Sequence, residues 1–173
     1  GGQLLLAARA GWRRDMITIV DWRVAELDKL AVQVHCNNYA DGADVLALAP
    51  DVVIVASGGL PNFGELEGEE YCNSVWDLLG GDVKPAKQLL VYDGRGRHEA
   101  LSCAEQLAAD GAQVTLVTID GSIGEDLGYA ERPVHRKQLY QYGVAVHFDL
   151  MLLSVRPAGD RLVATFRNDL TDE

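Results

Sequence analysis

Two glycines that follow a short apolar run are the residues best suited to chemistry in this sequence. The run Gln88–Asp93 precedes Gly94 and Gly96, and a helical pattern follows over residues 101–110. Strand, glycine turn and helix in this order are typical of a dinucleotide-binding βαβ unit. The glycines let the backbone approach a pyrophosphate, whose charge then faces the start of the helix. The pattern predicts cofactor-binding roles for Gly94 and Gly96.

Two positions depart from that fingerprint. Glu99 stands where a third glycine is expected, and a carboxylate repels a diphosphate. Thr118 ends the second strand, where an acid would accept from a ribose, and Asp120 is an imperfect substitute. No basic cluster follows Thr118 to meet a 2′-phosphate. An occupied nicotinamide site and a vestigial domain kept for packing both remain open.

The arginines beside the turn have two possible partners. Arg95 and Arg97 alternate with the glycines, and a guanidinium can hold phosphate as a fork. Their neighbours Asp93 and Glu99 offer carboxylates for the same purpose. The arginines therefore either bind phosphate or pair within the turn.

The remaining polar residues are better explained by structure than by chemistry. The four histidines lack i, i+4 spacing and nearby cysteines, so we expect core or solvated side chains and no metal site at His35, His98, His135 and His147. Ser57 has no Gly-x-Ser-x-Gly surroundings, which disfavours a hydrolase nucleophile. The loop residues Tyr129, Glu131 and Arg132 precede Pro133, and this order favours a helix-capping segment over a functional loop.

Composition narrows the class of protein. The chain has 173 residues, 48% of them apolar, which suffices for one core or two smaller units. A net charge of -11 disfavours nucleic acid and anionic membrane surfaces as partners. The sequence contains no run of 18 apolar residues, so we expect no membrane-spanning helix. The three cysteines are far apart in sequence, so we expect no disulfide framework. We expect the Cys103 thiol to be buried and the protein to lie in a reducing cytoplasm.

The first 60 residues predict part of an α/β unit. Apolar residues recur over 12–30 as in an amphipathic helix with one buried face. Residues 32–35 alternate as a short strand, and 43–48 form a short helical pattern. The continuous apolar run 51–56 predicts a central parallel strand buried on both faces. The chain begins without methionine, so we expect it to be a piece of a longer polypeptide.

The later segments predict a second unit. Residues 61–87 are rich in glycine and proline and read as a connector, with a short helix at 74–79. After the glycine turn, 119–131 is an irregular loop, 132–142 a helix and 144–148 a strand. A β-hairpin follows over 152–167. The predicted organisation is therefore a first unit at 1–60, a connector at 61–87 and a second unit at 88–173.

Several motifs resemble one flavoprotein family along nearly the whole chain. They are Gly1-Gly-Gln-Leu4, Glu26-Leu-Asp-Lys-Leu30, Asp51-Val-Val-Ile-Val-Ala-Ser-Gly-Gly59, Ser74-Val-Trp-Asp77, Leu90-Val-Tyr-Asp-Gly94 and Gly128-Tyr-Ala-Glu-Arg-Pro133. In this order they resemble the C-terminal nucleotide-binding region of the trimethylamine dehydrogenase/2,4-dienoyl-CoA reductase (NADH:flavin oxidoreductase) family. The last two motifs look most like its N-methyl amino-acid demethylase branch, which acts on substrates of the N-methylproline and dimethylglycine type.

The resemblance implies a larger flavin-dependent parent. Its upstream β/α barrel would hold FMN and an iron–sulfur cluster, so no catalytic or metal-binding residue is expected in this chain. The expected fold is α/β, a three-layer Rossmann-like FAD/NAD(P)-binding fold of the glutathione-reductase kind, present as an incomplete fragment. Residues 1–60 would be the tail of the FAD- or ADP-binding domain and 88–173 the NAD(P)-type domain. The resemblance assigns cofactor contacts in the first domain to Gly1, Gly2, Ala40, Ser57, Gly58 and Gly59.

Two functions follow from these expectations. The chain either serves a flavin-dependent oxidoreductase as its nucleotide-binding and electron-transfer scaffold, or is a non-catalytic packing and assembly module without a ligand of its own. For the second domain, an NAD(P)H site and a vestigial domain without a ligand are the two alternatives. The expected partners are the rest of the parent polypeptide and further copies in a homo-oligomer.

Overall fold

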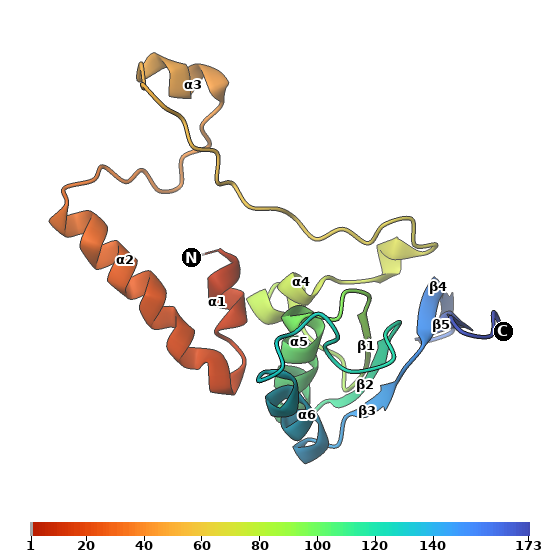
Figure 1. Cartoon of the computed structure of the whole chain (residues 1–173). Helices are drawn as coiled ribbons and strands as arrows, with labels where there is room; N and C mark the ends of the chain where they lie inside the picture. The colour runs from red at the N-terminus through yellow and green to blue at the C-terminus, as the bar shows by residue number, and fades with distance from the viewer. Residues whose placement is uncertain (1) are drawn as a thin grey trace.

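A parallel three-stranded sheet lies in the best-packed part of the chain. The computed structural model describes residues 2–173 and has a mixed α/β fold (Figure 1). Strands β1 (Gln88–Asp93), β2 (Gln113–Thr118) and β3 (Ala145–His147) lie in the order β1-β2-β3. Asp93 pairs with Thr118, so the carboxyl ends of β1 and β2 reach the same edge of the sheet. The predicted strands at 88–93 and 113–118 are confirmed.

Two helices complete the β-α-β-α-β order around this sheet. Helix α5 (His98–Ala109) packs against β1, β2 and helix α6 (Arg132–Gln141). Leu101 and Leu116 are fully buried between these elements, and each such side chain contributes about 1.5–3 kcal/mol to stability. The buried thiol predicted at Cys103 is confirmed, and burial raises its pKa to about 12.

The predicted hairpin forms a separate two-stranded sheet. Strands β4 (Leu150–Ala158) and β5 (Arg161–Asn168) pair antiparallel. The connector touches this hairpin, because the backbone N–H of Val155 donates to the carbonyl of Glu67 at 2.8 Å. The connector also contains a short 3-10 helix, η2 (Glu69–Tyr71), and α4 (Val75–Gly80), which confirms the predicted short helix.

The N-terminal helices are less well packed. They are α1 (Gln3–Ala7), the 3-10 helix η1 (Gly11–Met16) and α2 (Ile17–Lys29). The helix predicted at 12–30 forms, but its predicted buried face is wrong: α2 has no buried residue, and Trp22 is 59% exposed. Figure 1 shows α2 lying away from the sheet. Among the helices of residues 2–173, including α2, none is long and apolar enough to cross a bilayer.

The strands predicted at 32–35 and 51–56 are wrong. Both segments are irregular, and Ile54 is 85% exposed. A strand is stabilised by hydrogen bonds to a neighbouring strand, and no strand of residues 2–173 lies beside either segment. The short helix between them, α3 (Gly42–Ala47), does form because Asp41 caps it through its own side chain. Local signals are therefore sufficient for α3 and insufficient for the strands.

Candidate functional site

The predicted cofactor turn lies between β1 and α5, and its backbone donors are already engaged. Asp93 Oδ1 accepts hydrogen bonds from the backbone N–H groups of Arg95 at 3.1 Å and Gly96 at 2.9 Å. These amides are the donors that a pyrophosphate would require. Asp93 is buried, and this burial raises the pKa of its carboxyl, although the two backbone bonds act in the opposite direction. A buried carboxylate therefore already accepts from two of the backbone amides of the predicted cofactor turn.

Gly96 is needed for a close approach within the chain itself. Its φ is +61°, and a Cβ at this position would lie 2.4 Å from Asp120 Oδ2. The backbone N–H of Asp126 also donates to the Gly96 carbonyl at 3.0 Å. We call residues 119–131 the acidic loop. This loop packs onto the glycine turn where the fingerprint predicts a diphosphate.

The charges around the turn are mostly negative. Burial raises the pKa of Asp120, and the carboxylates of Glu125 and Asp126 raise it further. Arg97 pairs with Asp126, Nε to Oδ2 at 3.4 Å, so the alternative in which it pairs with Asp93 or Glu99 is wrong. The turn thus combines occupied donors with a repulsive field for phosphate.

The other predicted cofactor residues lie in the N-terminal part of the chain. Gly1 lies outside the described residues, and Gly2 precedes α1 with a φ of +58°. Ala40, Ser57, Gly58 and Gly59 are exposed in irregular segments. A Cβ on Gly58 would lie 3.9 Å from the side-chain amide of Gln3. The structure therefore brings the Gly58 region close to the start of α1, whereas Gly94 and Gly96 belong to the separate junction of β1 and α5.

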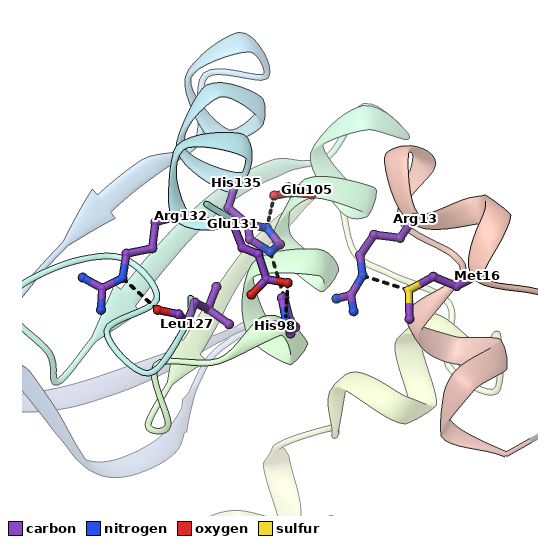
Figure 2. Close-up of polar contacts among 8 residues, drawn as sticks. All are labelled: Arg13, Met16, His98, Glu105, Leu127, Glu131, Arg132 and His135. Carbon is purple, nitrogen blue, oxygen red and sulfur yellow. Dashed lines mark hydrogen bonds and ion pairs between the residues drawn. The ribbon is translucent and has the colours of Figure 1, made fainter. Parts of the chain in front are cut away.

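A polar chain that the sequence reasoning missed lies between α5 and α6. Figure 2 shows its four residues, Glu105, His135, His98 and Glu131, which we call the histidine cluster. His135 is fully buried, and its Nδ1 lies 2.5 Å from Glu105 Oε1. His98 Nδ1 lies 3.1 Å from His135 Nε2, and His98 Nε2 lies 3.6 Å from Glu131 Oε1. The prediction of core or solvated histidines holds for the burial of His135 but omits these partners.

Trp12 connects the histidine cluster to the N-terminal segment. Its indole N–H donates to Glu105 Oε2 at 3.0 Å. Its ring meets the His135 ring edge to face, with centroids 5.2 Å apart. Glu105 thus contacts two different elements, η1 and α6, through its two carboxylate oxygens. Among residues 2–173, no group of histidine, cysteine, aspartate and glutamate has an arrangement that could hold a metal ion.

The segment before α6 acts partly as predicted. Pro133 lies in the first turn of α6, but the side chain of Glu131 makes no capping bond. Arg132 instead donates to the backbone carbonyls of Leu127 and Glu125 (Figure 2 shows the Leu127 bond). Tyr129 is 94% exposed. The predicted capping role is therefore replaced by an arginine that ties the acidic loop to α6.

Sequence periodicity held a signal for the histidine cluster. His98 and Glu105 are seven residues apart on α5, and Glu131 and His135 are four apart at the start of α6. Each pair therefore lies on one helix face. The two faces meet only through tertiary packing, so the sequence marks each pair and not their contact.

Comparison with known proteins identifies relatives along the whole chain. No family model matches it. The chain is 42% identical over 175 residues to a multifunctional alkene reductase/demethylase OYE of Caballeronia cordobensis, covering 100% of this chain and 26% of that protein. It is 38% identical to a probable N-methylproline demethylase of Rhizobium meliloti (strain 1021), covering 98% and 25%. It is 36% identical to an N,N-dimethylglycine/sarcosine dehydrogenase of Chromohalobacter salexigens, covering 99% and 26%.

Solved structures extend this likeness. The chain superimposes on 2-naphthoyl-CoA reductase, in complex with 2-naphthoyl-CoA, with a TM-score of 0.84 and 25% identity, covering 98% of this chain and 26% of that one. A 6-hydroxypseudooxynicotine amine oxidase from Pseudomonas geniculata N1 shares the fold, with a TM-score of 0.83, 22% identity and coverage of 98% and 27%. The chain spans about a quarter of the length of these relatives and structures. It belongs to the trimethylamine dehydrogenase/2,4-dienoyl-CoA reductase (NADH:flavin oxidoreductase) family, with the N-methyl amino-acid demethylase branch among its relatives.

Proposed function

We propose that this chain is the nucleotide-binding scaffold of a flavin-dependent oxidoreductase of the N-methyl amine demethylase or NADH:flavin oxidoreductase type. The family relationship supports this function for the parent. The β1-α5-β2-α6-β3 order supports a Rossmann-like second domain at 88–173, joined through 61–87 to the tail of an FAD- or ADP-binding domain at 1–60. FMN and the iron–sulfur cluster would belong to the upstream barrel.

The single observation that carries our proposal for the second domain is the engagement of the turn amides by Asp93. Because Asp93 accepts from Arg95 and Gly96, a dinucleotide would have to displace a buried carboxylate before binding. The contact between Gly96 and the acidic loop would have to open as well. The second domain then serves by its packing and binds neither NADH nor NADPH tightly.

The first domain is the better candidate for a bound nucleotide. FAD or ADP there would lie against backbone at Gly2, Ala40 and Ser57–Gly59, and the proximity of Gly58 to Gln3 supports one common site. Glycine at position 59 has open space around it and an ordinary φ. A methyl group there would cost the fold little and would obstruct a ligand that approaches the backbone.

Calorimetric titration with ADP, FAD, NADH and NADPH tests both domains. We expect ADP or FAD to bind and the nicotinamide nucleotides to give no saturable heat at micromolar concentrations. Gly59→Ala should weaken ADP or FAD binding at least ~10-fold through lost backbone approach, whereas Gly11→Ala, equally open and outside the proposed site, should not. Micromolar NADPH binding would contradict the closed second domain.

A packing and assembly module is the second candidate function. Exposed apolar residues favour it: Val24, Leu30, Ile54 and Val55 are each at least half exposed in the N-terminal part. We propose that the rest of the parent polypeptide covers them, and that the assembled parent is a cytoplasmic homo-oligomer that binds neither nucleic acid nor membrane. No heat with any of the four nucleotides would favour this module over the scaffold.

A further inference from the structure

We propose that the histidine cluster is a relay that takes up one proton and couples this uptake to the contact between Trp12 and α5. The chain of contacts runs from Glu131 at the surface through His98 and the buried His135 to Glu105 (Figure 2). Trp12 then extends it to η1. The relay therefore crosses from α6 through α5 to the N-terminal segment.

Hydrogen-bond chemistry determines the state without the added proton. An ionised Glu105 only accepts, so His135 must donate from Nδ1 and Trp12 from its indole nitrogen. A neutral His135 then presents a lone pair at Nε2, and His98 donates to it from Nδ1 across 3.1 Å. Neutral His98 then has its accepting lone pair at Nε2, which faces the Glu131 carboxylate at 3.6 Å. At the outer end of the relay, two hydrogen-bond acceptors, His98 Nε2 and the Glu131 carboxylate, therefore face each other.

One added proton gives these two facing acceptors a hydrogen to share. It binds His98 Nε2 from solvent and gives an N–H that faces Glu131. The positive charge is shared, because the Nδ1 proton of His98 can move to His135 Nε2 while His98 keeps the new proton. Every ring nitrogen of the pair then faces a partner of the opposite kind. The loaded pair holds three ring protons and one positive charge between two carboxylates.

A second added proton has no place in this geometry. It would put an N–H on both sides of the 3.1 Å gap between His98 and His135. Two donors would then face each other, with two positive charges in adjacent rings. The two rings therefore share a single added proton, as strongly coupled groups do.

The surrounding charges set where the added proton is favoured. Arg13 of η1 and Glu99 of α5 face His98 in addition to Glu131 and His135. Burial lowers the pKa of His98, and the positive charge of Arg13 lowers it further. Arg13 repels the added charge from His98, and the Glu105 carboxylate attracts it toward His135 although that ring is fully buried.

Trp12 reports on this movement because it shares Glu105 with His135. When positive charge approaches Glu105, the carboxylate becomes a weaker acceptor for the indole N–H. The His135 ring also changes its charge 5.2 Å from the indole ring. Protonation at the α5–α6 junction is thereby communicated to the contact that holds η1.

Nitrogen-15 NMR of the chain labelled at histidine and tryptophan tests the relay. We expect the nitrogen-15 signals of His98 and His135 to change together in one step, with one proton taken up in total. The Trp12 indole signal should move with the same midpoint. The exposed side chains of Trp22 and His147, which lie outside the cluster, serve as internal controls. Two separate histidine steps, or a Trp12 signal that does not change, would overturn the proposal.

Variants at the outer end separate a relay from a merely buried network. Glu131→Gln removes the carboxylate that stabilises the loaded state, so the shared midpoint should fall by about a few tenths of a pH unit, with Trp12 still following it. Glu125→Gln, an exposed change in the same acidic loop, should leave the midpoint in place. His98→Gln should abolish the pH response of Trp12. Equal effects of the two glutamate variants, or a persisting response in His98→Gln, would refute the relay.

Discussion

The side chain of Asp93 determines whether the backbone amides of the glycine turn are free or hydrogen-bonded. Its carboxylate accepts hydrogen bonds from two backbone amides of the turn. Burial nevertheless raises its folded-state pKa above the unfolded value of 3.8. Its contribution to stability is therefore greatest below pH 3.8 and is lost as the pH rises through the folded-state pKa. The hydrogen bonds stabilise the turn, whereas the charge opposes folding near neutral pH.

Two substitutions separate these effects. Asp93→Asn keeps an accepting oxygen and removes the charge, so its unfolding free energy at pH 7 should equal or exceed that of the wild type by on the order of 1 kcal/mol. Asp93→Ala leaves the Arg95 amide and the buried Gly96 amide without their acceptor and should cost about 1–3 kcal/mol. Urea denaturation at pH 4 and pH 7 measures both. A larger loss in Asp93→Asn than in Asp93→Ala would contradict this account.

At the scale of elements, the acidic loop and the glycine turn act as one packed unit. The loop reaches the turn through the Asp126 amide and the Asp120 side chain, which leaves no room for a side chain at Gly96. Arg132 ties the other end of the loop to α6. The loop is therefore held at both ends across the carboxyl edge of the sheet.

Substitution of Gly96 measures this packing. Gly96→Ala combines a positive φ with a Cβ that would meet Asp120 Oδ2, whereas Gly143→Ala has a similar φ and open space. The control should lose about 1 kcal/mol from backbone strain alone, and Gly96→Ala a further ~1–3 kcal/mol from overpacking. Adding Asp120→Ala to Gly96→Ala should recover part of the second loss in thermal unfolding. Equal losses at both glycines would show that the loop does not press on the turn.

The same elements show how far sequence alone can reach. The unit 88–118 was predictable because its strands are neighbours along the chain and its turn chemistry is local. The segment 51–56 has an equally strong strand pattern, but its partner strands are not provided by adjacent residues, and it remains irregular. Asp93 was visible beside the turn, yet its bonds to the turn amides depend on backbone geometry. The histidine cluster depends on packing between α5 and α6 and could not be read from either helix alone.

At the scale of the whole molecule, packing is unevenly distributed. The core residues come from α4, β1, α5, β2, the acidic loop, α6 and the residue before β3. Residues 31–41 and 48–66 are mostly irregular and exposed. The early elements α1 and η1 nevertheless contact the packed part through Leu6 and Trp12. Within the N-terminal part, we therefore expect α1 and η1 to be more stable than residues 31–41 and 48–66.

Limited proteolysis should reveal this difference. We expect the first cleavages within 31–41 and 48–66, because unpaired backbone fits a protease site more readily than helix or sheet. The C-terminal product should begin before η2 and resist further digestion. The segment containing Trp12 should remain bound to it after cleavage, as size-exclusion chromatography with mass spectrometry would show. First cleavage within 88–147 would contradict the assigned core.

The three cysteine thiols also differ in burial, and this difference permits selective chemical labelling. Cys103 is fully buried with a pKa of about 12, Cys72 is half-buried with a raised pKa, and Cys36 is exposed. A thiolate is the reactive form toward maleimides, so reagent reaches Cys36 first. A single dye can thus be placed on the exposed N-terminal part without mutagenesis. The fluorescence of this dye would change when the remaining polypeptide or a second copy binds and covers the N-terminal part.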